Sequence, residues 1–292
     1  MTGFSSIKSI DNAISLGQYQ ECYFNKTSSA NVIPAGGPGE LFTATGSPGP
    51  ITFSGTAGVG TQLSNTSAGA LIPLSEGAVS PLNRYLTKFQ VTSSDAAFSP
   101  GIVILVDVLF YYPSLILNAT ETVLDNTSTI SRYTDGVGVK ALVFNAATLG
   151  GAVTWTLDFI ADDDGSSQTS AGVGGSSSSF VPSLIWASAG GTGANQGPLF
   201  PLTGTAQGIR SVTDYNNTGG NITGSVNLLL CRPLAMVPVN SRFITTEIDF
   251  VNQFISLPQI QDGACLGMIH IPGTATAAGG CNFSGSLQYV WG

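Results

Sequence analysis

The stretch VILVDVLFYYP, from Val103 to Pro113, decides the fold class. It is rich in branched and aromatic residues and ends at a proline, which is typical of a central β-strand buried on both faces. Asp107 lies inside it, and a buried carboxylate needs a hydrogen-bonding partner. The apolar run is too short to span a bilayer. The chain start lacks the apolar segment of a cleaved signal, so neither export nor membrane insertion is expected.

A second stretch, SVNLLLCRP from Ser225 to Pro233, parallels the first. Each is followed by an Asp-Gly turn, Asp135-Gly136 in one copy and Asp262-Gly263 in the other, and then by an apolar strand. Each copy closes on an alternating aromatic strand, formed by Trp155, Leu157 and Phe159 or by Leu287, Tyr289 and Trp291. The sequence therefore predicts an internally duplicated pair of β-rich units.

We expect an all-β fold with a few short helices, in which antiparallel sheets form a sandwich or jelly-roll-like structure. The predicted segments are an N-terminal arm with Gly/Pro/Ser-rich strands and loops at 1–84, a first β-rich unit at 85–165, a Ser/Gly-rich loop region at 166–200 and a second β-rich unit at 201–292. Apolar residues at helical spacing predict a helix in the arm, with Ser5 or Ser6 as its N-cap. Residues 118–126 and 241–254 can also form short helices.

The composition favours a protein that packs against other protein surfaces. Charged residues make up only 9% of the chain, and the net charge is -8 with no cluster of Lys or Arg. A nearly uncharged exterior suits a docked protein, and the missing basic clusters argue against nucleic-acid binding. The four cysteines show no metal-binding spacing and are expected to be free buried thiols: Cys22, Cys231, Cys265 and Cys281.

The residues give little support to catalysis, and no catalytic, cofactor or metal residue is predicted. The single histidine, His270, lies in the apolar context MIHIP and is expected to be a satisfied strand residue. The turn Asp162 to Asp164 offers hard ligands for calcium without the EF-hand pattern, and whether it binds a cation stays open. The acids available for glycoside cleavage are Asp107, Asp158, Glu247 and Asp249.

Aromatic side chains offer a platform for sugars, but most fall at alternate positions of predicted strands, where core packing is favoured. These residues are Tyr111, Tyr112, Trp155, Trp186, Tyr289 and Trp291.

Three segments together resemble virion structural proteins encoded near the major capsid gene of some tailed bacteriophages. They are RYTDGVGVKAL from Arg132, LPQIQDGACLGM from Leu257 and the terminal YVWG from Tyr289. The resemblance covers about residues 100–292 and the opening SIKSIDNAISLGQ. It implies a cement or decoration protein on the outer capsid lattice of the virion, assembled in the host cytoplasm, with the major capsid protein as its partner. It implies no catalytic or cofactor residues.

The leading hypothesis is therefore a capsid cement protein that forms a dimer or trimer. Its interface candidates are Ile7, Ile10 and Ile14 in the arm and Tyr289 and Trp291 in the last strand, because termini often reach neighbouring molecules. Alternatives are a fibre or tail protein that binds a receptor or glycan, and the major capsid protein itself. The long helix of the usual tailed-phage shell protein is not predicted. A glycan-degrading enzyme rests only on scattered acids.

Overall fold

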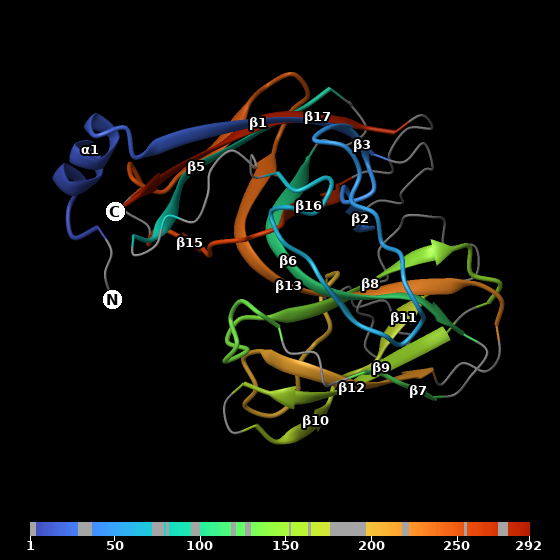
Figure 1. The fold of residues 1–292 in the computed structure, drawn as a ribbon. Helices are drawn as coiled ribbons and strands as arrows, with labels where there is room; N and C mark the ends of the chain where they lie inside the picture. The colour runs from blue at the N-terminus through green and yellow to red at the C-terminus, as the bar shows by residue number, and fades with distance from the viewer. Residues whose placement is uncertain are drawn as a thin grey trace.

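The computed structural model describes residues 4–28, 37–71, 79, 82–94, 100–117, 121–125, 130–151, 153–162, 165–175, 197–217, 222–253, 256–273 and 280–292. Within these ranges the chain forms one α-helix and seventeen β-strands, so the predicted all-β class is confirmed. Figure 1 shows an upper, a central and a lower sheet, with the helix beside the upper one. Their strands pair antiparallel.

Each sheet combines strands from distant parts of the chain. The upper sheet has the order β14-β5-β17-β1-β3, with β15 also on β5: β1 (Tyr19–Thr27), β3 (Thr45–Ser47), β5 (Arg84–Ser93), β14 (Thr246–Asp249), β15 (Gln259–Ile260) and β17 (Asn282–Trp291). The central sheet has the order β2-β16-β6-β13-β8, with β4 on β6: β2 (Gly39–Glu40), β4 (Thr61–Gln62), β6 (Gly101–Ile116), β8 (Lys140–Ala147), β13 (Ser225–Val239) and β16 (Leu266–Pro272). The lower sheet has the order β10-β9-β12-β7, with β11 on β9: β7 (Glu121–Val123), β9 (Val153–Ala161), β10 (Ser167–Thr169), β11 (Val173–Gly175) and β12 (Ile209–Asn217).

The two longest strands, β6 and β13, form the centre of the molecule. They pair along almost their whole length, from Ser225 opposite Ile116 to Val239 opposite Gly101. β16 lies on the other side of β6, so this strand has a neighbour on both edges. Side chains on both of its faces are buried, which confirms the prediction of a fully buried central strand.

Three apolar cores hold the layers together. At one end of the central sheet Leu105 shares a core with Phe89 of the upper sheet, and at the other end Val143 shares a core with Trp155 of the lower sheet. Phe144 is next to Val143 in β8 and therefore points to the opposite face. There it belongs to a third core, which the segment following β2 covers.

The strand order repeats about a pseudo-two-fold axis between β6 and β13. The central order β16-β6-β13-β8 has the two long strands inside and two shorter ones outside. The upper sheet contains the order β14-β5-β17, and the lower sheet contains the matching order β7-β12-β9. Five strands of the first repeat therefore occupy the positions of five strands of the second, in this order: β5 and β12, β6 and β13, β7 and β14, β8 and β16, and β9 and β17. Each sheet mixes strands from both sequence repeats. The two repeats are therefore interlocked in space, and the boundaries drawn at 85–165 and 201–292 stay a prediction about the sequence.

Three local predictions differ from the structure. In the two segments that can form helices, the described residues instead contain β7 and β14, because each pairs with an available edge strand, β12 or β5. Part of the first segment lies outside the described residues. The Ser/Gly-rich region contributes β10 and β11, which both pair with β9. An unpaired strand edge favours such additions because its backbone groups need partners.

The predicted N-terminal helix is confirmed as α1 (Ile7–Ser15). Ser6 is its N-cap, and the Ser6 hydroxyl accepts a hydrogen bond from the Ser9 N–H at 3.2 Å. This bond satisfies a backbone donor that the first helical turn leaves without a partner. No helix in the described part of the chain is long and apolar enough to cross a membrane.

Two buried charged side chains fix the loop after β2. The Lys26 ammonium donates to the carbonyls of Ala44 at 3.3 Å and Gly49 at 2.8 Å. The Glu40 carboxylate accepts the Thr43 N–H at 2.8 Å. Burial lowers the pKa of Lys26 to about 8 and raises the pKa of Glu40 to about 7. The loop is thus held at the cost of burying two ionisable groups.

We expect the variant Glu40→Gln to change the pH dependence of stability. The folded-state pKa of Glu40 lies above its ordinary value of 4.5, so the stability contributed by this carboxyl is present at low pH and is lost as the pH rises through about 7. The free energy of unfolding of wild type relative to Glu40→Gln should fall by about 3 kcal/mol between about pH 4 and pH 8. Urea unfolding measures it, and a difference that is constant with pH would contradict the assignment.

Candidate interaction surface

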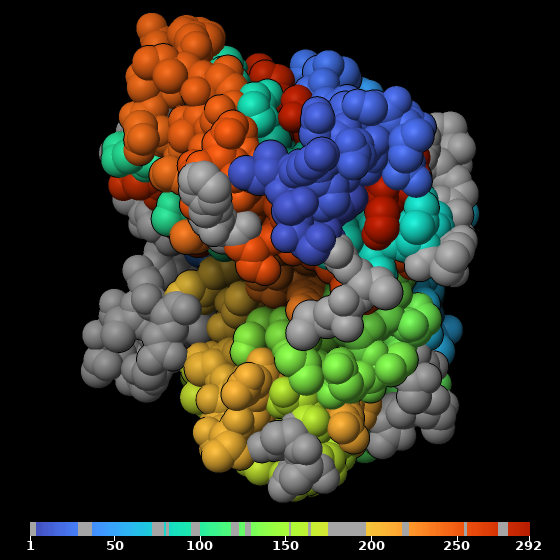
Figure 2. All heavy atoms as spheres, turned by 90° about the vertical axis from the view of Figure 1, so that its left-hand side faces the viewer, coloured from blue at the N-terminus to red at the C-terminus, as the bar shows by residue number. Residues whose placement is uncertain are grey.

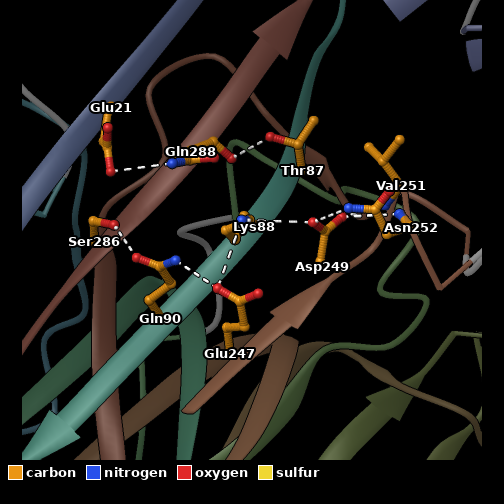
Figure 3. A network of polar contacts seen from close by, with 10 residues as sticks. All are labelled: Glu21, Thr87, Lys88, Gln90, Glu247, Asp249, Val251, Asn252, Ser286 and Gln288. Carbon is orange, nitrogen blue, oxygen red and sulfur yellow. Dashed lines mark hydrogen bonds and ion pairs between the residues drawn. The ribbon is translucent and has the colours of Figure 1, made fainter. Parts of the chain in front are cut away.

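Polar side chains lie in a regular row across the outer face of the upper sheet. The strand register places Glu21, Gln288, Lys88 and Asp249 in one row across β1, β17, β5 and β14. Alternate residues such as Phe89 point inward to the core. Figure 3 shows contacts at both ends of this row: the Gln288 amide donates to Glu21 at 3.2 Å, and Lys88 forms an ion pair with Asp249.

Lys88 is the only cation drawn in this network, and two carboxylates neutralise it. Its ammonium lies 3.5 Å from Glu247 and 3.6 Å from Asp249. Asp249 also accepts the N–H groups of Val251 at 3.1 Å and Asn252 at 2.9 Å. Burial alone would raise the pKa of Asp249, but the bonds from Asn252 and the charge of Lys88 lower it. Asp249 is thus an ionised cap for the turn after β14.

A groove of about 280 Å³ lies where helix α1 meets this polar face. Its helix side presents isoleucines, while the strands and the turn after β14 present mainly polar groups. The residues around it are Ile7, Ile10, Asp11, Ile14, Tyr19, Thr87, Lys88, Asp249, Val251, Asn252 and Gln288. Figure 2 shows the helix in dark blue on the surface of this side of the molecule. The groove thus has one apolar wall and a largely polar floor.

The structure brings three of the five predicted interface residues together at this groove. Ile7 and Ile14 are 55% and 45% exposed, whereas Ile10 is buried against the sheet. Tyr289 is fully buried, and its hydroxyl donates to Gln20 at 2.6 Å, because β17 is paired on both edges. Trp291 packs against the same core. The accessible part of the predicted set is therefore the helix.

The four acids considered for glycoside cleavage do not converge on one cleft. Asp107 is buried in the central sheet, Asp158 lies in the lower sheet, and Glu247 and Asp249 flank Lys88 in the upper sheet. Of the aromatics proposed as a sugar platform, four are buried in the cores, Trp291 is partly buried, and Trp186 lies outside the described residues. The buried four are Tyr111, Tyr112, Trp155 and Tyr289.

Comparisons with known proteins give no family. No family model matches the chain, and no curated protein matches it. Among solved structures, it is similar to the infectious bursal disease virus Gx strain structure at 8% identity and TM-score 0.20, covering 94% of this chain and 80% of that one. For the VP2 subviral particle of infectious bursal disease virus the identity is 10%, the TM-score 0.18, and the coverage 93% and 80%. TM-scores this low establish neither a shared fold nor a shared function.

The other candidate groups from the sequence, Asp162 of the acidic turn, the histidine and the cysteines, are held within the fold. Asp162 accepts the N–H groups of Gln207 and Gly208, both at 2.8 Å, while Asp163 and Asp164 lie outside the described residues. His270 is buried with its ring 5.1 Å from that of Phe283. All four cysteines are free and buried, as predicted. No group of three or more potential metal ligands occurs among the residues that the structure describes.

Most positive side chains make contacts within the chain. Lys26, Arg84 and Arg132 are buried, and Lys88 lies between two carboxylates. The others make the following contacts: Lys140 and Arg210 donate to the carbonyls of Gln207 and Asp135, and Arg232 and Arg242 lie over the rings of Tyr133 and Phe243. That leaves Lys8, which is exposed on helix α1. The exterior therefore presents little positive charge.

Proposed function

We propose that this chain is a non-catalytic structural protein of a virion, and specifically a cement or decoration protein on the outside of a bacteriophage capsid. The observation that carries the proposal is that seven of the nine basic side chains contact groups elsewhere in the described part of the fold, while only Lys8 and Arg242 do not. A surface so poor in free positive charge is unsuited to phosphate neutralisation. It suits contacts made by apolar and hydroxyl groups.

The architecture supports the same function. Two sandwiches share one central sheet and exchange equivalent strands, and apolar cores join that sheet to the upper and to the lower sheet. An interlocked body of this kind suits a protein that stays docked on a particle surface. The resemblance of three sequence segments to phage head-associated proteins supplies the class of partner, the major capsid protein.

Binding to capsids that lack the chain is the experiment that tests this function. We expect the purified protein to cosediment with such capsids to saturation, at a fixed number of copies per capsomer. Because few free charges are available, binding should persist in about 0.5 M salt, where exposed charge pairs are strongly screened. Binding that does not saturate, or that occurs only on tails or fibres, would contradict a cement role.

A further inference from the structure

The turn between β13 and β14 carries an exposed apolar projection, Phe243 and Ile244, which we call the knuckle. These side chains are 66% and 59% exposed. Phe243 has a φ of 59° in the left-handed region, a conformation that is uncommon for a bulky residue, and its N–H is held by the Ser93 carbonyl at 2.8 Å. The Arg242 guanidinium lies 5.1 Å from the centre of the Phe243 ring. The knuckle is thus apolar and carries one positive charge.

The groove beside α1 has the complementary character. Ile7 and Ile14 offer an exposed apolar wall, and Asp11 places an exposed carboxylate on the same helix. Lys88 in the floor is already neutralised by two carboxylates and does not offset Asp11. Among the described residues, neither Asp11 nor Arg242 belongs to an ion pair. Each surface therefore offers an unpaired charge of opposite sign beside exposed apolar side chains.

We propose that the knuckle of one copy of this chain docks in the groove of a second copy, with Arg242 of one beside Asp11 of the other. Pairing these groups covers the apolar side chains that each copy leaves in water and supplies each charge with a partner. The knuckle lies at the end of β5, near Ser93, whereas the groove lies near the middle of that strand, at Thr87 and Lys88. The contact is between different patches, so it closes reciprocally in a two-fold dimer or as a ring.

The effects of charge reversal test the contact. In light scattering coupled to gel filtration, wild type should show a molar mass that is a multiple of 29.9 kDa. The single variants Arg242→Asp and Asp11→Arg should each weaken self-association about tenfold or more, and the double variant should restore it. Phe243→Ser should also weaken it. All of these positions are exposed, so thermal unfolding should confirm that the variants remain folded.

Met236→Ser is the matched control, because Met236 is 56% exposed on β13 and lies outside both the knuckle and the groove. Its association should equal that of wild type. The proposal is overturned if the wild-type chain stays monomeric at every concentration tested. It is also overturned if the assembly survives both single charge reversals, or if the double variant does not recover self-association. None of these results depends on capsid binding, so the self-contact and the cement function fail independently.

Discussion

Replacing Arg132 by methionine is expected to lower the free energy of unfolding by about 3–5 kcal/mol. The Arg132 guanidinium binds the fully buried Asp107 carboxylate through two hydrogen bonds, at 2.9 Å and 3.1 Å. It also donates to the carbonyls of Leu63 at 2.9 Å and Val108 at 3.1 Å. The methionine leaves a buried carboxyl without its countercharge and two carbonyls without this donor. Burial already raises the pKa of Asp107, and the charge of Arg132 opposes this effect, so Asp107 should bind a proton more readily in the variant.

A partly exposed group of ion pairs on the protein surface provides the control for this effect. Lys88→Met removes the partner of Glu247 and Asp249 on the outer face of the upper sheet, where water screens the charges. Its expected cost is below about 1 kcal/mol. Urea unfolding of both variants at neutral pH makes the comparison. If both variants lost the same free energy of unfolding, the larger contribution assigned to the buried pair of Asp107 and Arg132 would be contradicted.

Acidification is expected to remove the stability that neutral His270 contributes to the fold. Burial lowers the pKa of this imidazole to about 3 in the folded state. The unfolded chain takes up the proton near the ordinary value of 6.5, so the stability contributed by neutral His270 is present above that pH and is lost as the pH falls toward 3. At about pH 4 the loss should reach about 3 kcal/mol.

The variant His270→Leu isolates this contribution, because leucine fills a similar volume and does not titrate. The difference in free energy of unfolding between wild type and variant should shift by about 3 kcal/mol in favour of the variant between about pH 7 and pH 4. Glu40 acts in the opposite direction over an overlapping range, so the wild-type curve alone is shallower than either contribution. A difference that stays constant with pH would show that His270 is accessible to protons in the folded state.

The sequence predicts those parts of the fold that depend on local pattern. Alternation and apolar runs identify β5, β6, β9 and β17, and the paired Asp-Gly turns reveal the repeat that the strand order displays. The need of Asp107 for a partner is also predicted. The identity of that partner is not, because Arg132 reaches it only once the chain has folded. The short strands β10 and β11 were missed because they form on the free edge of β9.

For the candidate surface, too, local pattern predicts some features, and the others depend on tertiary contacts. Helical spacing correctly places isoleucines on one side of α1, yet periodicity does not tell whether the same chain or another covers them. Ile10 and Tyr289 are covered by this chain, while Ile7 and Ile14 remain accessible. The groove itself joins α1, β5, β17 and the turn after β14. Only the tertiary structure brings these segments together, so no local sequence signal predicts it.

A cryo-electron microscopy map of the intact virus particle tests most directly whether this chain binds the outside of a capsid. We expect density that fits the two interlocked sandwiches at repeated positions on the outer lattice, in contact with the major capsid protein. Particles whose outer lattice lacks this density, or density for the chain only on a tail or fibre, would contradict the proposed cement function.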